Sequence, residues 1–237
     1  MKNVLITGGS RGIGEACVRE FIKNNYNVFF CYNKNEERAK RLAEEMGAVS
    51  IKCDISNSDE VKKMIDFIHS YGKISVLVNN AGIAEQKLFS DISEDDWDRM
   101  FNINIKGMFL VTKAVLPDMI HEKSGKIINI SSIWGITGAS CEVHYSASKA
   151  AIIGFTKALS KELGLSGINV NCVAPGVIDT EMNSHLSDDD KKTLCDETTL
   201  NRMGTSDEIA KSIYFLASDN ADFITGQVIS PNGGIVI

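Results

Sequence analysis

Short runs of consecutive apolar residues recur along this chain, and most are followed by longer segments in which apolar residues return every three or four positions. The short runs are typical of strands buried on both faces of a sheet, and the longer segments of amphipathic helices. The predicted strands are 3–7, 27–31, 49–53, 74–78, 127–130, 168–174 and 228–230, and the predicted helices are about 15–23, 36–46, 61–71, 94–119, 150–165 and 206–216.

Regular alternation of strands and helices predicts a parallel sheet with helices on both faces, because parallel strands need crossover connections. We therefore expect an α/β fold of the Rossmann type, a doubly wound parallel sheet of about seven strands, in one domain covering residues 1–237. Ligands of such sheets bind at the carboxyl ends of the strands. Inside the predicted helix 94–119, Pro117 should end or kink the helix, and Asn104 is a poor helix former.

Composition fits a globular protein and narrows the possible partners. The 237 residues are 43% apolar and 24% charged, and the net charge of −6 gives no overall attraction to nucleic acid or to an anionic membrane. The chain has no apolar run of about 18 residues and no signal peptide, so we expect a cytoplasmic protein without a membrane or nucleic-acid partner. The six cysteines form no Cys-x-x-Cys pair, so we expect reduced thiols and no metal site.

Glycines follow the first predicted strand in the arrangement Thr7-Gly8-x-x-x-Gly12-x-Gly14, just before a predicted helix. This order makes a phosphate cradle, since glycines let the backbone approach a diphosphate and the helix amino terminus offers free N–H groups. Glycine turns also simply connect elements, but this context favours nucleotide binding. The residues expected around the diphosphate are Gly8, Ser10, Arg11, Gly12, Ile13 and Gly14.

The end of the second predicted strand indicates which dinucleotide binds. In many dinucleotide folds an acidic residue here holds the adenosine ribose and disfavours a 2′-phosphate. This chain has Tyr32-Asn33-Lys34 there, and Arg11 and Arg38 add positive charge that would attract a phosphate. The sequence therefore predicts NADP(H), with Asn33 and Lys34 among its contacts. The alternative is that Lys34 and Arg38 only solvate the start of a helix.

Polar or small residues also follow the third and fourth predicted strands. Asp54 could accept a hydrogen bond from an adenine amino group, or could equally start a turn. Asn80, Ala81 and Gly82 suit a cofactor wall. Both places lie at the carboxyl edge of the sheet, where the cofactor is expected.

Tyr145 and Lys149 are four residues apart, so they share one face if this segment is helical. A cation about 4 Å from the phenol would lower its pKa by about three units, which would let Tyr145 act as a general acid or base near neutral pH. Ser132, after strand 127–130, adds a hydroxyl that can hold a carbonyl oxygen. An isolated Tyr-x-x-x-Lys is more often an ordinary amphipathic pair, and only the other motifs outweigh that interpretation.

Together these residues resemble the short-chain dehydrogenase/reductase family. The resemblance spans nearly the whole chain and rests on the glycine turn, Asn79-Asn80-Ala81-Gly82, Asn104, Ser132, Tyr145-x-x-x-Lys149 and Pro175-Gly176. It implies an NADP(H)-dependent oxidoreductase in which Tyr145 donates a proton to a carbonyl oxygen that Ser132 holds. It further implies that Lys149 lowers the tyrosine pKa and binds the nicotinamide ribose, that Asn104 fixes a relay water, and that cofactor contacts come from Asp54, Asn80, Pro175, Gly176, Val177, Ile178 and Thr180.

Within that family the chain most resembles the bacterial 3-oxoacyl-acyl-carrier-protein reductases, in 130–132, 145–149, 170–176 and 226–234. This implies reduction of a 3-oxoacyl thioester on acyl carrier protein, in fatty acid synthesis, by a homotetramer. The segments that would face the acidic carrier depart from this expectation, because 122–126 keeps only lysines as cations and 165–167 holds a neutral serine.

Two alternatives stay open. Similar sequences are associated with reducing a ketone on modified elongation factor P, and an acidic residue near the mouth of the site would suit the amine of that substrate. Glu142 and His144 could meet such a polar substrate or could be solvated loop residues. A regulator that senses NADP(H) without turnover is the other alternative, but it should lack part of the set Asn104, Ser132, Tyr145 and Lys149, which is complete here.

The last third of the chain carries three further expectations. The polar segment 178–203 should be a substrate lid with one short helix. The helix 206–216 should begin with Ser206 as its cap, without the usual Glu three residues later. The apolar end Ile235-Val236-Ile237 should lie at a subunit interface.

Overall fold

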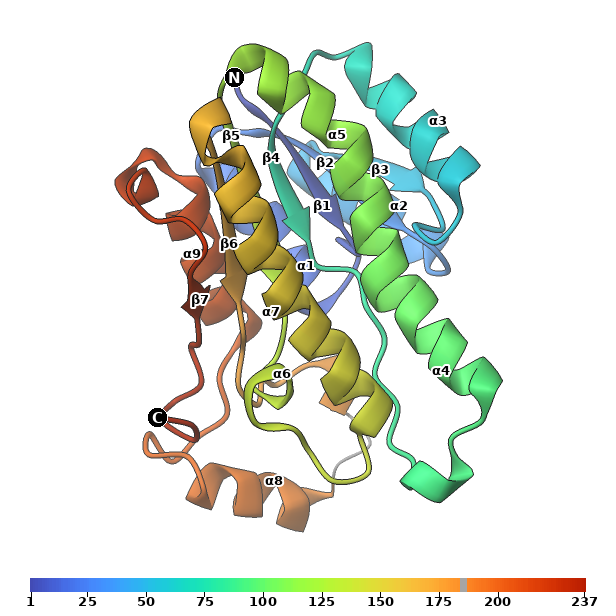
Figure 1. Cartoon of the computed structure of the whole chain (residues 1–237), viewed down its shortest axis with the longest axis vertical. Helices are drawn as coiled ribbons and strands as arrows, with labels where there is room; N and C mark the ends of the chain where they lie inside the picture. The colour runs from blue at the N-terminus through green and yellow to red at the C-terminus, as the bar shows by residue number, and fades with distance from the viewer. Residues whose placement is uncertain (184–186) are drawn as a thin grey trace.

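The computed structural model describes residues 1–183 and 187–237. In this part of the chain, seven strands form one parallel sheet in the order β3-β2-β1-β4-β5-β6-β7 (Figure 1). The strands are β1 (Asn3–Thr7), β2 (Asn27–Tyr32), β3 (Val49–Lys52), β4 (Ile74–Asn79), β5 (Gly125–Ile130), β6 (Ile168–Val173) and β7 (Val228–Ile229).

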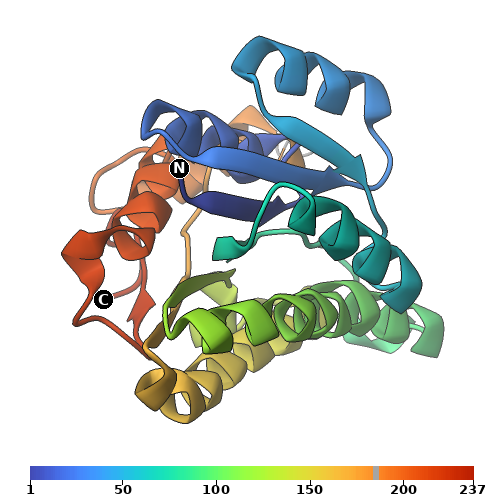
Figure 2. The same ribbon diagram turned by 90° about the horizontal axis from the view of Figure 1, so that it is seen from above.

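Helices cover both faces of this sheet, which Figure 2 shows from above. The core on one face includes α1 (Gly12–Lys23), α2 (Glu36–Met46) and α9 (Ser206–Ala217). The core on the other face includes α3 (Ser58–His69), α5 (Met108–Glu122) and α7 (Val143–Leu163). The central strands are buried on both faces for this reason, and every residue of β1 is buried. The predicted α/β fold of the Rossmann type is confirmed.

The predicted helix 94–119 consists of three consecutive helical pieces. The prediction of one continuous helix that Pro117 ends or kinks was therefore wrong. The three pieces are α4 (Glu94–Phe101), a π-helical turn (Asn102–Gly107) and α5, which continues past Pro117 to Glu122. The Asn104 amide explains the wide turn, because it accepts a hydrogen bond from Ile83 N at 2.8 Å and donates to Ile83 O at 3.0 Å. These tertiary bonds outweigh the low helix propensity of asparagine.

The amino terminus of α9 also differs from the prediction. Its cap is Thr205, one residue earlier than expected, and its hydroxyl accepts from Glu208 N at 3.3 Å. The Glu208 carboxylate in turn accepts from Thr205 N at 2.8 Å. The full capping box is therefore present. The prediction found no glutamate three residues after the cap because it placed the cap at Ser206.

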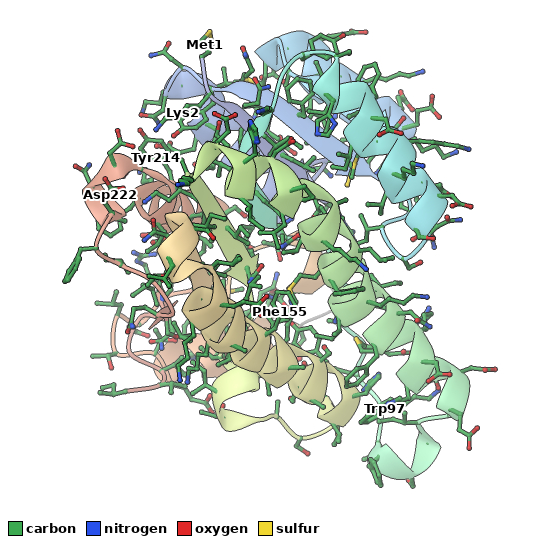
Figure 3. All side chains as sticks on the ribbon, turned by 45° about the horizontal axis from the view of Figure 1, so that its top comes forward. Met1, Lys2, Trp97, Phe155, Tyr214 and Asp222 are labelled. Carbon is green, nitrogen blue, oxygen red and sulfur yellow. The ribbon has the colours of Figure 1, made fainter. Side chains whose placement is uncertain are left out.

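The two edges of the sheet differ in chemistry. At the amino edge, Lys126 pairs with Asp222 at 2.6 Å and Lys2 with Asp219 at 2.9 Å, and Figure 3 shows Lys2 and Asp222 in the part of the molecule near Met1. At the carboxyl edge lie the glycine-rich turn and the short helices α6 (Trp134–Thr137) and α8 (Asp188–Asp196). None of the helices in the described ranges is long and apolar enough to cross a membrane.

Candidate active site

A cavity of about 730 Å³ lies beyond the carboxyl ends of the strands, and Ser132, Tyr145 and Lys149 all line it. Ser132 follows β5, and the other two residues lie in the first two turns of α7. The helix begins at Val143, seven residues earlier than predicted, so Tyr145 and Lys149 do lie one turn apart on the same helix.

The backbone of α7 is fixed behind these side chains by residues that the sequence interpretation missed. Ser148 Oγ donates to Tyr145 O at 2.7 Å and accepts from Asn104 Nδ2 at 3.0 Å. Ser131 Oγ donates to Lys149 O at 2.7 Å. Asn104 is thus a link between the π-helical turn and α7, and it does not line the cavity. The sequence alone does not show that Asn104 bonds to Ser148, which in turn bonds to the backbone of Tyr145.

Burial dominates the electrostatics of the phenol and the ammonium. It raises the pKa of Tyr145 to about 12, against a smaller lowering by a hydrogen bond with Ser132. Burial also lowers the pKa of Lys149 to about 8. The ammonium donates to Ile130 O at 2.9 Å and lies 5.6 Å from the centre of the tyrosine ring.

The predicted lowering of the Tyr145 pKa by Lys149 is therefore wrong for this structure. Desolvation of the buried phenol is the largest cause of the shift, and Lys149 is not among the causes. The consequence is that Tyr145 keeps its proton at neutral pH. A protonated phenol on a cavity wall is suited to donating that proton.

The glycine-rich turn lies at the amino terminus of α1, which starts at Gly12. Arg11 occupies the cap position without a side-chain hydrogen bond to the helix, so its side chain leaves the first N–H groups of α1 to other partners. Gly12 has φ +52°, in the left-handed region, and a Cβ at Gly14 would lie 2.1 Å from Gly8 O. Side chains at these positions would strain or block the turn. This is the form of a phosphate cradle.

Thr7 and Asn80 join the glycine turn to the end of β4. Thr7 Oγ1 accepts from the backbone N–H groups of Asn80 and Ala81, both at 3.0 Å. Asn80 Nδ2 donates to Thr7 O at 3.0 Å and to Gly8 O at 3.1 Å. The Asn80 side chain therefore holds the cradle, and Asn80 also lines the cavity. Thr7 was quoted as the first residue of the glycine motif, but its hydrogen bonds to the end of β4 were not predicted.

The sequence model of the family described as short chain dehydrogenase matches residues 2–191. The chain belongs to the short-chain dehydrogenase family. It is an oxidoreductase that acts on CH–OH and C=O groups.

Several relatives of this short-chain dehydrogenase are 3-oxoacyl-[acyl-carrier-protein] reductases. The protein of that name from Staphylococcus epidermidis is 40% identical over 240 aligned positions, covering 99% of this chain and 98% of the relative. The one from Chlamydia muridarum is 43% identical over 241 positions, covering 99% and 97%. The crystal structure of 3-oxoacyl-[acyl-carrier protein] reductase from Brucella melitensis has a TM-score of 0.94 at 35% identity, covering 98% of this chain and 90% of that one.

The residues predicted to form the site of this short-chain dehydrogenase fall into two groups. Those that line the cavity are Ile13, Asn80, Gly82, Ser132, Tyr145, Lys149, Pro175, Gly176, Val177, Ile178 and Thr180. Those that lie outside its lining are Gly8, Ser10, Arg11, Gly12 and Gly14 of the glycine turn, Ala81 beside it, Asn104, and Asn33, Lys34 and Asp54 near the ends of β2 and β3.

At the predicted adenosine end, the side chains of Asp54 and Arg38 have protein partners. Asp54 Oδ1 accepts from the Ser56 backbone N–H at 2.9 Å and from its hydroxyl at 2.7 Å, as in the turn interpretation. Lys34 is exposed after β2. Arg38 donates to Glu15 at 3.0 Å and also to Glu181. Within the described residues, no group of three or more acidic, histidine or cysteine side chains could hold a metal ion.

The rest of the cavity lining agrees only in part with the expectations from the sequence. Ile83, Ala84, Glu85 and Gln86 after β4 were not indicated, Glu142 was left open, and Asn183, Asp190, Thr193 and Leu194 lie in the predicted lid 178–203; Trp134 also lines the cavity. Their contribution arises from loops and α8 folding over the sheet edge, which no local pattern shows. Carboxylates are prominent among them, and Lys149 is the one lysine or arginine in the described lining.

The two residues left open in the sequence interpretation, Glu142 and His144, differ in position. Glu142 lines the cavity. His144 is fully buried, with an exposed fraction of 0%, so the expectation that it is a solvated loop residue was wrong. Its Nε2 lies 3.7 Å from Glu85 Oε2, and Glu85 accepts a hydrogen bond from Arg99 at 3.0 Å. His144 therefore packs behind Glu85, within the first turn of α7.

Two further expectations concern the ends of the lid and of the chain. The segment 178–203 carries the short helix α8, and its ends are joined by hydrogen bonds from Asp179 N to Gly204 O at 2.9 Å and from Gly204 N to Val177 O at 3.0 Å. Part of this predicted lid, 184–186, lies outside the described residues. Ile237 is exposed at the end of the chain, and its predicted subunit interface stays a prediction.

Proposed function

We propose that this short-chain dehydrogenase reduces a ketone to a secondary alcohol with NADPH. The observation that carries the proposal is the meeting of Ser132, Tyr145 and Lys149 in one cavity that also reaches the glycine-rich turn through Ile13. A proton donor, a hydroxyl that can hold a carbonyl oxygen, and a place for a dinucleotide are then close together. We propose that residues 1–237 act as one domain, with 178–203 as the lid over its substrate.

The residues present fit a dinucleotide. The uncapped start of α1 and the crowded Gly14 make a cradle that a Cβ would fill, and such a helix start attracts phosphate. We propose contacts from the predicted set, with Lys149 and Asn80 toward the nicotinamide side and Asn33, Lys34 and Asp54 toward adenosine. NADP(H) is favoured over NAD(H) because no carboxylate ends β2 and Arg11 and Arg38 lie nearby. The bound cofactor would supply a hydride to the substrate carbon.

In this proposal the side chains manage the proton and the oxygen. Ser132 holds the carbonyl oxygen, and Tyr145 donates the phenolic proton to it as negative charge develops there. The Lys149 ammonium lies 5.6 Å from the centre of the ring, where its positive charge would favour the tyrosinate that is left. Asn104 stays in the set as the residue predicted to fix a relay water, which would return a proton to the site.

The substrate we propose is a 3-oxoacyl thioester carried on acyl carrier protein. The relatives from Staphylococcus epidermidis and Chlamydia muridarum, which are named as reductases of that substrate and align along nearly all of this chain, support it. The homotetramer and the cytoplasmic location stay predictions of the family resemblance.

The test is NADPH oxidation by the purified chain with acetoacetyl-coenzyme A, a simple 3-oxoacyl thioester. We expect turnover with NADPH and a lower kcat/KM with NADH. Loss of NADPH absorbance reports the rate. Equal or better turnover with NADH would contradict the cofactor assignment. Silence across a broad panel of ketones would instead favour the non-catalytic NADP(H)-sensing regulator.

A second substrate has one observation in its favour. Glu85, Glu142 and Asp190 line the cavity, and a wall with this charge suits a ketone that carries an amine. The ketone on modified elongation factor P is such a substrate. Comparing kcat/KM for an amino ketone and for acetoacetyl-coenzyme A separates the two: a clear preference for the amino ketone would replace the thioester, and a clear preference for the thioester would retain it.

A further inference from the structure

Six side chains of alternating charge form a continuous row beside the glycine-rich turn. They come from the turn, from α1, from α2 and from the short 3₁₀ helix Glu181–Asn183. The row consists of Glu45, Arg19, Glu15, Arg38, Glu181 and Arg11, in that order, joined by contacts of 2.6 Å (Arg19–Glu45), 3.0 Å (Arg19–Glu15), 3.0 Å (Arg38–Glu15) and 3.7 Å (Arg11–Glu181), and by a hydrogen bond from Arg38 to Glu181.

Glu181 is the member of this row that comes from the segment 178–203. Its two carboxylate oxygens face different arginines. Oε1 faces Arg38 of α2, and Oε2 faces Arg11 of the glycine-rich turn. The hydrogen bond from Arg38 holds the pKa of Glu181 below its usual range. The preceding residue, Thr180, lies over the turn, because a Cβ at Gly12 would be 3.6 Å from Thr180 Cγ2. A negative charge from the segment thus bridges two cations of the nucleotide-binding edge.

Arg11 and Arg38 are the cations that favour a 2′-phosphate in the proposed cofactor assignment. Guanidinium groups bind carboxylates and phosphates with the same planar arrangement of N–H donors, so the two anions compete for the same atoms. Glu15 cannot be the group that leaves, because α1 carries it and Arg19 also holds it. Glu181 remains as the anion that a phosphate would replace.

We propose that Glu181 is a competing anion at the 2′-phosphate position, and that NADP(H), but not NAD(H), exchanges with it on Arg38 and Arg11. This inference rests on the proposed use of NADP(H). Its consequence is a link between cofactor and substrate sites, because Thr180, just before this short helix, and Asn183, its last residue, line the catalytic cavity. The 2′-phosphate, although far from the reacting atoms, would then release Glu181 from the two arginines. This would free the start of the segment 178–203, which faces the substrate.

The experiment measures dissociation constants of NADPH and NADH by calorimetric titration, without substrate or turnover. Glu181→Gln keeps the shape of the side chain and removes its charge. We expect it to bind NADPH about fivefold more tightly, the size expected when a partly exposed ion pair no longer has to be broken, and to bind NADH within about twofold of the original chain. The 2′-phosphate fragment 2′,5′-ADP should show the same gain as NADPH, and ADP should show none.

Two controls make the result specific. Asp179→Asn removes a carboxylate two residues away that is exposed, so it tests the effect of net charge alone and should leave both constants within about twofold. In an Arg38→Gln background, Glu181→Gln should tighten NADPH by clearly less than fivefold, because only the longer contact of Glu181 with Arg11, at 3.7 Å, is left to compete. This non-additivity distinguishes competition for Arg38 from a general electrostatic effect.

The outcomes separate this inference from the proposed function. Weaker NADPH binding in Glu181→Gln, no change, or equal tightening of NADPH and NADH would overturn the competing-anion proposal. The ratio of the two constants in the unaltered chain tests the NADP(H) assignment by itself. If that ratio does not favour NADPH but Glu181→Gln makes it do so, Glu181 is a competing anion and the cofactor assignment fails.

Discussion

At the scale of single residues, the chemistry of the site depends on how burial changes the pKa values of Tyr145 and Lys149. Tyr145 and Lys149 are both buried, and burial moves their pKa values apart, from 10.0 to about 12 and from 10.5 to about 8. Sequence spacing placed the pair on one helix turn but gave no measure of desolvation. The expected attraction between the charges was therefore overestimated, and the structure favours a phenol that holds its proton.

The Lys149 shift predicts a dependence of stability on pH. Between pH 8 and pH 10 the unfolded lysine keeps a proton that the folded one has lost, so the free energy of unfolding rises with pH through this window. Lys149→Met lacks this contribution. The difference in free energy of unfolding between the original chain and the variant should therefore grow by about 2 kcal/mol from pH 8 to pH 10, measured by urea unfolding. The raised pKa of Tyr145 acts in the opposite direction only above pH 10. A difference that stays constant from pH 8 to pH 10 would refute the shift.

At the scale of elements, hydrophobic patterns predicted the strands well because the central ones are buried on both faces and so are nearly all apolar. β1 was predicted with its exact ends, Asn3 and Thr7. The interruption between α4 and α5 was not predicted, because the reason for it is a contact between Asn104 and Ile83, 21 positions apart. The cap of α9 was misplaced by one residue, although Thr205 and Glu208 are a readable pair.

The contacts of Asn104 lead to a prediction about the π-helical turn. Asn104→Ala removes the acceptor for Ile83 N and the donor to Ser148, and Asn104 is only 1% exposed. Leaving a buried N–H without a partner should cost about 1–3 kcal/mol of the free energy of unfolding. Asn102→Ala, an exposed asparagine of the same turn, is the matched control and should cost less than about 0.5 kcal/mol. Equal effects of the two substitutions in urea unfolding would show that the amide bonds do not hold the turn.

At the scale of the whole molecule, the fold gathers at one sheet edge side chains that are far apart in the sequence. The glycine turn, Asn80, Ser132 and Pro175 follow β1, β4, β5 and β6, so alternation alone was enough to bring them together. The substrate side could not be predicted in this way. Its wall is made by loop residues 83–86 and by α8, whose position depends on packing over the edge.

The acidic character of this wall gives a prediction about substrate charge. Glu142→Gln should lower kcat/KM for a ketone bearing a primary amine about fivefold relative to a neutral 3-oxoacyl thioester, because it removes a negative charge from the cavity. Glu162→Gln, at the exposed far end of α7, should change neither value. If Glu142→Gln affects both substrates alike, the charge of the wall does not select the substrate.

The central claim is that Tyr145 gives its proton to the substrate oxygen. Tyr145→Phe keeps the ring and removes the proton, with the exposed Tyr71→Phe as the control. We measure kcat with NADPH and acetoacetyl-coenzyme A, and NADPH binding by titration. The account predicts a loss in kcat of about 100-fold or more with the NADPH dissociation constant within about twofold. Turnover by Tyr145→Phe close to that of the original chain would contradict it.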